Sequence, residues 1–275
     1  LGYSATTVKS DEIISARTTN VANALSGKVA GLQVSSTSSD PGSVSNIVIR
    51  GFSSINGNNQ PLYVVDGVPL QNNMFSGSGK NVATGGIANV SSEDIESMTV
   101  LKGAAATALY GSRAANGVII ITTKTGKKGD GRNFSISYNG SLQARQVSLL
   151  PEMQNEVGQG WNGGQTFIEN GSWGPALDGS LQVYGPVWNH QQLIHEYSAK
   201  KDNVKDFFDL GWSQNHNIAL SGVSGDSKMN YYLSYSYSND DGIMPKDYDT
   251  FERNTIAFRG SYDAADWLKV SSSLN

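Results

Sequence analysis

Histidine and cysteine are the side chains that most often carry catalysis and metal binding, and this chain offers few of them. It contains three histidines, His190, His195 and His216, and no cysteine among its 275 residues. The histidines have no metal-ligand spacing, and without cysteine there is neither a thiolate site nor a disulfide framework. The sequence also contains no recognisable nucleophile–base pair and no paired catalytic carboxylates. It therefore predicts a protein that is not an enzyme and that holds no cofactor and no metal.

Acidic side chains are densest at Asp240, Asp241, Asp247 and Asp249. Carboxylates this close together could ligate Ca²⁺, but their order lacks the EF-hand pattern. We interpret the segment as a solvated surface loop, and a calcium site is the alternative.

Two charged residues stand at the ends of short apolar runs. Arg50 follows Ile47–Ile49, and Asp66 lies between Leu62–Val65 and Gly67. An aspartate before glycine is typical of a turn in which the carboxylate bonds its own backbone. Arg50 is either a solvated charge at the end of a strand or a structural residue. We expect neither side chain to be catalytic.

The segment Gln71–Ala88 is rich in glycine, asparagine and serine. It is long for a structureless loop in a compact domain, which indicates a functional loop. Asn72 and Asn73 precede Met74 and Phe75, so that an apolar contact stands beside hydrogen-bonding amides. This combination suits a sugar or a peptide backbone. An inert flexible loop is the alternative.

The elements that must position these residues are organised around Asp94–Gly126. Ala104–Tyr110 is a run of good helix formers, and Gly111 stands where a left-handed C-cap is needed. Asn116-Gly117 then turns the chain into Val118–Ile121, which is β-branched and apolar on both faces and therefore predicts a buried strand.

Upstream, Asn20 is the expected N-cap of a helix that ends at Gly31. Strands interleaved with short helices predict a small α/β domain over residues 1–126. A charged, glycine-rich linker over 127–133 is the best domain boundary.

Beyond residue 133 the hydrophobic period changes to two, which predicts antiparallel strands whose apolar rows contain no charge. We expect these strands at Phe134–Arg145, Asn217–Gly222, Lys228–Ser238, Thr255–Tyr262 and Trp267–Leu274. Short turns alternate with long connections, the longest over about 146–215. That asymmetry is typical of outer-membrane barrels, with the long loops outside. Within the long loop, Trp161, Trp173 and Trp188 either stack on sugars or hold the loop together.

Composition narrows the class of protein further. Hydrophobic residues make up 38% of the chain, and no apolar run approaches the roughly 18 residues of a spanning helix. A formal net charge of −4 gives no reason to expect nucleic acid as a partner.

Four ordered motifs resemble the plug-domain signature of TonB-dependent outer-membrane transporters of the SusC-like branch. They are NVANALSGKVAGLQV (20–34), IVIRGF (47–52), PLYVVDGVP (61–69) and LKGAAATALYGSRAANGVIIITTKTG (101–126). Downstream, DFFDLGWSQNHNIALSG (206–222), NYYLSYSYSNDDGIMP (230–245) and FERNTIAFRG (251–260) resemble the first barrel strands of the same family.

The resemblance implies an α/β plug domain followed by antiparallel transmembrane strands over 134–275, the N-terminal part of a plugged barrel of about 22 strands. It implies a buried, structural Arg50, and loops at the plug apex that contact substrate, which adds Asn56 and Asn58 to the candidate ligand residues. The other residues of the plug motif are Asp66, Gly67, Lys102, Gly111, Arg113 and Gly117. Thr99 and Gly103 depart from the family, which usually has Glu and Asp at these positions, so an electrostatic latch built on those carboxylates is not expected.

The function implied by the resemblance is active import of a glycan or peptide nutrient across the bacterial outer membrane, with the plug as gate. The implied partners are the TonB energising complex, a SusD-like surface lipoprotein, an oligosaccharide or oligopeptide ligand, and outer-membrane lipid. Five strands cannot close a barrel, so we expect the sequence to be a piece of a longer protein that lacks the TonB-binding motif. The alternative from the residues alone is a soluble β-sandwich that binds glycans, because a sandwich has the same period of two.

Overall fold

The computed structural model describes residues 4–16, 18, 20–36, 40–43, 45–52, 59–70, 87, 90–126, 133–166, 168 and 170–275. The chain divides into two compact units. The main unit comprises residues 1–145, 210–242 and 246–275, and the insert unit comprises residues 146–209 with 243–245. The predicted linker at 127–133 lies outside the described residues except for Asn133.

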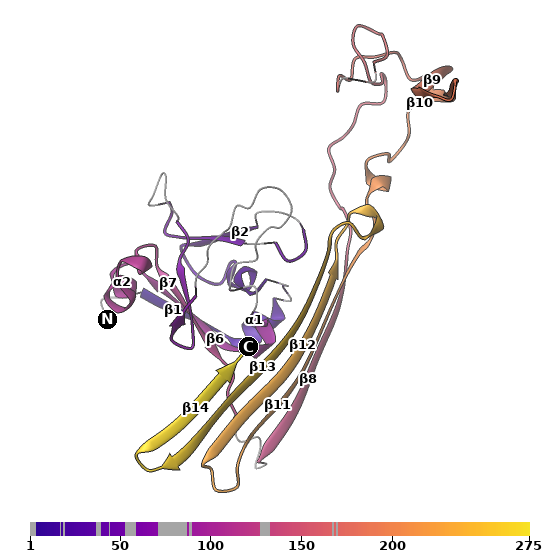
Figure 1. The fold of residues 1–275 in the computed structure, drawn as a ribbon. Helices are drawn as coiled ribbons and strands as arrows, with labels where there is room; N and C mark the ends of the chain where they lie inside the picture. The colour runs from indigo at the N-terminus through magenta and orange to yellow at the C-terminus, as the bar shows by residue number, and fades with distance from the viewer. Residues whose placement is uncertain are drawn as a thin grey trace. The chain divides into compact units, whose positions relative to one another are not determined.

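The first part of the main unit is an α/β domain built on a mixed sheet (Figure 1). Among the described residues, its strands are ordered β1 (Ser4–Lys9), β6 (Ile95–Lys102), β7 (Val118–Thr123), β4 (Leu62–Val65) and β5 (Val68–Pro69). Strand β7 is antiparallel to β6 and parallel to β4. A separate pair is formed by β2 (Leu32–Ser36) and β3 (Ser45–Ile49). The helical segments are α1 (Ser10–Ser15), α2 (Ala104–Tyr110), and the 3₁₀ turns η1 (Val21–Leu25), η3 (Ser92–Asp94) and η4 (Gly111–Ala114).

Both faces of this mixed sheet are buried, which confirms the prediction for Val118–Ile121. One face packs α1, η1 and β3 around a cluster that includes Ile13, Leu25, Ile47, Met98 and Ile119. The other face packs a smaller cluster of Val64, Leu101, Ala106, Ala114 and Val118. The Tyr63 phenol lies in the larger cluster, and burial raises its pKa.

Local turn chemistry follows the sequence with one correction. Gly111 ends α2 at φ 68°, and the Asn20 side chain accepts the Ala22 N–H at 3.0 Å, so both predicted caps are confirmed. The helix expected to run to Gly31 was wrong, because after η1 the chain continues in turns. The buried apolar residues Val21, Leu25 and Val29 therefore reach the core without a full α-helix.

The second part of the main unit is a sheet of long antiparallel strands, here called the long-strand sheet (Figure 1). Among the described residues, its order is β14 (Leu268–Leu274), β13 (Thr250–Ala265), β12 (Met229–Asp241), β11 (Gly211–Val223) and β8 (Phe134–Arg145). All five predicted strands are present, and β11, β12 and β13 are longer than the ranges predicted from their apolar alternation. No helix in the described part of the chain is long and apolar enough to cross a membrane.

The two faces of the long-strand sheet differ sharply in polarity. An exposed apolar row crosses four strands as the cross-strand neighbours Tyr138, Ile218, Tyr235 and Ile256. One residue further along each strand, the polar row Asn139, Asn217, Ser236 and Thr255 lies on the opposite face. The apolar rows are exposed and do not meet in a core, so the β-sandwich alternative is wrong.

The insert unit, which occupies most of the predicted long connection, contains secondary structure that the sequence analysis did not predict. It contains the antiparallel hairpin of β9 (Asp178–Trp188) and β10 (Gln191–Ser198), followed by η5 (Lys205–Phe207). The period-two pattern of the hairpin was not recognised because apolar residues occur on both of its faces. The connection between β12 and β13 contains the short turn η6 (Pro245–Asp247).

Gly117 offers a test of packing in the α/β domain. Its φ is +96°, and a Cβ there would lie 2.8 Å from Ile49 Cδ1 and 3.0 Å from the Leu101 carbonyl oxygen. Gly67 has a similar φ of +88° but open space around it. Both alanine variants strain the backbone, by about 1–3 kcal/mol, but Gly117→Ala adds a steric clash. Calorimetric unfolding should therefore show a clearly larger loss of stability, relative to the native protein, for Gly117→Ala than for Gly67→Ala. Equal losses would mean that β3 and β6 do not pack against this turn.

Candidate functional site

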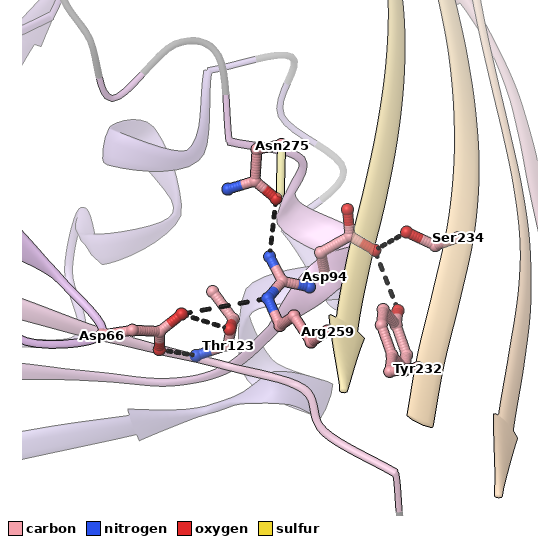
Figure 2. Close-up of polar contacts among 7 residues, drawn as sticks. All are labelled: Asp66, Asp94, Thr123, Tyr232, Ser234, Arg259 and Asn275. Carbon is pink, nitrogen blue, oxygen red and sulfur yellow. Dashed lines mark hydrogen bonds and ion pairs between the residues drawn. The ribbon is translucent and has the colours of Figure 1, made fainter. Parts of the chain in front are cut away.

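The buried carboxylate of Asp94 joins the α/β domain to the long-strand sheet (Figure 2). Asp94 ends η3, where its N–H donates to the Ser91 carbonyl and its own carbonyl accepts the Lys124 N–H. Its Oδ1 accepts hydrogen bonds from the Tyr232 hydroxyl at 2.8 Å and the Ser234 hydroxyl at 2.6 Å. Only 1% of Asp94 is exposed, so these hydroxyls replace the water that an ionised carboxylate would otherwise require.

The hydroxyls that meet Asp94 belong to a longer row on β12. Alternation along the strand places every second side chain on the buried face. The row comprises Tyr232, Ser234, Ser236 and Ser238, all at most 4% exposed. The Ser236 hydroxyl donates to the Ser91 hydroxyl at 3.1 Å, one turn before Asp94. The segment Ser91–Asp94 therefore rests on β12 through hydroxyl groups rather than through apolar packing.

Asp66 forms a second polar contact at the opposite edge of the same interface. Its backbone is left-handed, with φ 48°, and its carboxylate accepts the Thr123 N–H at 2.9 Å and the Thr123 hydroxyl at 2.5 Å. The parallel pairing of β4 with β7 brings the end of β4 beside Thr123. The expectation that Asp66 bonds its own backbone was therefore wrong, because a neighbouring strand supplies the donors.

Arg259 connects these two contacts (Figure 2). Its Nε lies 3.8 Å from Asp66 Oδ2, its Nη2 donates to Asn275 Oδ1 at 2.9 Å, and its guanidinium lies 5.7 Å from the centre of the Tyr232 ring. A cation at this distance from an aromatic face is attracted to it. A continuous polar chain thus runs from Asp66 through Arg259 and Tyr232 to Asp94.

Small residues let the two parts of the main unit approach closely elsewhere. A Cβ on Gly42 would lie 2.3 Å from the Phe251 ring, and one on Gly126 would lie 2.5 Å from backbone atoms of Gly222 and Tyr231. Below 3.0 Å neither position has room for a side chain without a shift of its neighbours. Glycine at 42 and 126 is therefore part of the fit.

Arg50 requires a correction, because it is exposed and not buried as the resemblance implied. It ends β3 in a left-handed conformation with φ 60°, and its N–H donates to the Gly31 carbonyl at 2.8 Å. Its Nη1 would lie 3.2 Å from a Cβ on Gly103. The guanidinium therefore lies over a glycine at the position where the family usually carries a carboxylate.

The other residues of the predicted motif occupy separate places in the α/β domain. The ammonium of Lys102 donates to the Ala30 carbonyl at 2.6 Å although Lys102 is only 6% exposed. Arg113 is exposed in η4, and Gly67, Gly111 and Gly117 all have positive φ. Thr99 bonds the Thr7 hydroxyl at 2.9 Å across β6 and β1, where the wider family usually has a glutamate.

The predicted ligand residues fall outside what the structure describes. They are Asn56, Asn58, Asn72, Asn73, Met74 and Phe75. The structure therefore brings none of them into a described site.

In the acidic group at Asp240–Asp249, Asp240 contacts a basic side chain of the protein. Among the described residues, no three histidine, aspartate or glutamate side chains gather as a metal would require. Asp240 is buried and forms an ion pair with Arg145 on β8. The Tyr138 hydroxyl hydrogen-bonds His216 Nδ1 at 2.7 Å, and His195 Nδ1 lies 2.8 Å from the Glu196 carbonyl. These contacts organise strands and connections.

The arrangement holds the α/β domain and the long-strand sheet together. It contains hydroxyl–carboxylate bonds, one wide ion pair and close glycine contacts. Sequence reasoning missed Asp94, Ser91 and Arg259. The only available signal for Arg259 was a charge among small residues on the polar face of a strand. For Asp94 there was none, because the recognisable signals of the Asp94–Gly126 segment all lie further along the chain.

Asp94 can be tested with two substitutions of different severity. Asp94→Ala leaves the buried Tyr232 and Ser234 hydroxyls without their acceptor, which should cost about 1–3 kcal/mol. Asp94→Asn keeps an oxygen at the same place and should cost less. Calorimetric unfolding and protease susceptibility of the α/β domain would measure both variants. An alanine variant as stable and as protease-resistant as the native protein would show that Asp94 does not join the two parts.

Comparison with known proteins supports the fold independently. Residues 1–118 match the TonB-dependent Receptor Plug Domain family. The chain is 36% identical over 86% of its length to TonB-dependent receptor SusC of Bacteroides thetaiotaomicron, of which it covers 21%. It is 31% identical over 99% of its length to TonB-dependent receptor P26 of Formosa agariphila, of which it covers 24%. The chain thus spans between a fifth and a quarter of the length of these curated relatives.

Among solved structures, the RagAB peptide importer in its 'closed-closed' state aligns with 99% of this chain and 30% of the other, at 27% identity and a TM-score of 0.74. The 'open-open' state of the same importer gives 27% identity and a TM-score of 0.73. The matched length includes both the α/β domain and the long strands. The chain belongs to the SusC-like branch of the TonB-dependent receptors, the plugged β-barrels of the outer membrane, and its α/β domain is the plug.

Proposed function

We propose that the native protein actively imports a nutrient across the outer membrane, with the plug as a gate that TonB energises. The observation that carries this proposal is the polar character of the plug contact. Hydrogen bonds from β12 hydroxyls to Asp94 and Ser91 hold the plug against the strands. A neutral bond of this kind contributes about 0.5–1.5 kcal/mol net and one to a charged group about 1.5–3 kcal/mol, so a pull has only a small number of bonds to break.

The proposed ligand is an oligosaccharide or an oligopeptide. Similarity to the RagAB peptide importer supports a peptide, and the resemblance to the SusC-like branch implies either class. A SusD-like lipoprotein is the proposed partner at the surface, since the peptide importer is named as a two-part RagAB assembly. Asn56, Asn58 and the segment Asn72–Phe75 are the proposed ligand contacts on the plug.

Outer-membrane lipid is the proposed neighbour of the apolar rows on the long strands. Contiguous exposed apolar surface of this kind marks an interaction face. Within the proposed domain boundaries, the plug covers 1–126, a linker 127–133, and the first barrel strands 134–275. The connection over about 146–215 would then be a loop on the outer side.

A disulfide between Ser91 and Ser236 tests the gate directly. The two hydroxyl oxygens are 3.1 Å apart, and the chain contains no other cysteine to compete. Cysteines at positions this close can form a bond of about 2.05 Å. The oxidised double variant Ser91→Cys/Ser236→Cys should lose ligand uptake, because η3 is then fixed to β12.

Uptake should return on reduction, and each single cysteine variant should import normally under oxidising conditions. Radiolabelled ligand uptake by whole cells would measure the effect, and gel mobility would verify the crosslink. Normal uptake by the fully crosslinked protein would rule out a gate that moves away from β12 at this point.

Adjacent residues on β13 test the lipid-facing register. Ile256 is 59% exposed in the apolar row, whereas Thr255 lies in the polar row with Ser236. An arginine facing mid-bilayer costs about 2–4 kcal/mol, while one facing a hydrated interior costs little. Ile256→Arg should therefore reduce the folded outer-membrane fraction far more than Thr255→Arg. The reverse order would mean that the apolar row does not face lipid.

A further inference from the structure

The hairpin of the insert unit has one polar, aromatic face. Cross-strand pairing of His195 with Gln182 and of Tyr197 with Ser180 fixes which side chains share a face. Since side chains alternate along a strand, Gln182, Tyr184, His195 and Tyr197 lie on one side of the hairpin, together with the exposed Leu193, which pairs with Tyr184. Leu181 lies on the other side, and it is 75% exposed.

A glycine-rich segment fixes one wall of this face. A Cβ on Gly158 would lie 1.9 Å from the Tyr197 hydroxyl oxygen, so the phenol rests directly on the Gly158 backbone. That backbone is held in turn, since the Gly158 N–H donates to the Pro175 carbonyl and the Gly158 carbonyl accepts the Gly174 N–H, both at 2.9 Å. Among the described residues the buried Tyr197 hydroxyl has no hydrogen-bond partner. The ring of Tyr197 therefore lines this face, while its hydroxyl is buried against Gly158.

The tryptophans of the same unit are used differently. A Cβ on Gly171 would lie 2.3 Å from the Trp161 indole, and the Trp161 and Trp173 backbones bond Gly164, Gly160 and Gly163. Trp161 therefore holds the glycine-rich segment together. It does not contribute to the polar face of the hairpin.

A cavity of about 530 Å³ lies at the hairpin, lined by Gln182, Tyr184, His195 and Tyr197 of this face and by Val183 and Glu196 of the other. Small-molecule sites typically measure about 300–1,000 Å³ and combine aromatic or apolar walls with a few polar groups. The lining fits this description, with two tyrosines and Leu177 beside amides. Its polar members include Gln165, Gln182, His195, Glu196, Lys200 and Asn203.

We propose that this cavity binds a neutral oligosaccharide, as a capture site of the importer outside the plug. Amide and phenol groups both donate and accept hydrogen bonds, as sugar hydroxyls do. The Tyr184 ring is 57% exposed and offers an amphipathic surface to the apolar face of a sugar ring. Lys200 and Glu196 carry opposite charges, which gives a charged ligand no net attraction. The proposal rests on the proposed import function for its physiological role, but not for the binding itself.

The site can be tested by binding to the native protein in outer-membrane vesicles from cells without the energising complex. The probes are maltoheptaose, laminarihexaose and xylohexaose, with neutral hexapeptides as the competing class. Tyr184→Ala should weaken binding of at least one glycan about tenfold, and the milder Gln182→Ala about threefold. Leu181→Ala, next to Gln182 on the opposite face, is the matched control and should bind like the native protein.

The possible outcomes distinguish the proposed binding site from the proposed import function. Loss of glycan binding in both pocket variants but not in Leu181→Ala supports the site. A response of the hexapeptides alone overturns the oligosaccharide assignment, and unchanged binding of every probe overturns the site. If glycan binding depends on the pocket but energised cells import none of the bound glycan, the import function fails while the binding site stands.

Discussion

The seating of the plug depends on one buried carboxylate that is held mainly by hydroxyl groups. Asp94 is 1% exposed and is satisfied by the Tyr232 and Ser234 hydroxyls of β12 and by backbone bonds around η3. A buried charge without such donors would be strongly unfavourable. The donors exist only while the plug is seated, so the position of η3 is defined by a need for hydrogen bonds rather than by apolar contact area. Apolar packing would have given a stronger but less specific attachment.

This requirement explains the unusual polarity of the long strands. Serine occupies positions 234, 236 and 238 on the face that a soluble protein would fill with apolar side chains, while Tyr235 and Leu233 are 44% exposed on the other. The pattern is inverted because the two faces have different neighbours. One face meets the polar surface of the plug, and the other is the face that we propose contacts outer-membrane lipid. The glycine at position 126 also allows close approach, because a Cβ there would lie 2.5 Å from the Tyr231 backbone.

Much of the fold could be predicted because its signals are local. The β-branched run Val118–Ile121, the Asn20 cap and the left-handed Gly111 each depend on a few neighbouring residues. The period-two pattern of the long strands likewise depends only on residues that are neighbours in the sequence. The interface could not be predicted, because Asp66 meets Thr123, and Asp94 meets Tyr232, only through tertiary pairing. The predicted burial of Arg50 was wrong for a related reason. The family motif predicts burial, but its environment depends on position 103, which is glycine here and provides no carboxylate.

Thr99 and Gly103, the two departures from the family, both affect contacts inside the plug. Thr99 forms a neutral hydroxyl bond within the plug's own sheet, and Gly103 leaves the guanidinium of Arg50 at the surface. The carboxylates that act across the interface are instead Asp66 and Asp94, connected through Arg259 and Tyr232 on the strands. Because Asp66 is 3.8 Å from Arg259 and its side chain is 34% exposed, this ion pair is weakened by solvent. The hydroxyls of β12 are shielded from solvent and are therefore the stronger part of the attachment. If a pull separates Asp94 from β12, it removes the stronger part of the attachment. The solvated Asp66–Arg259 pair would then offer little further resistance.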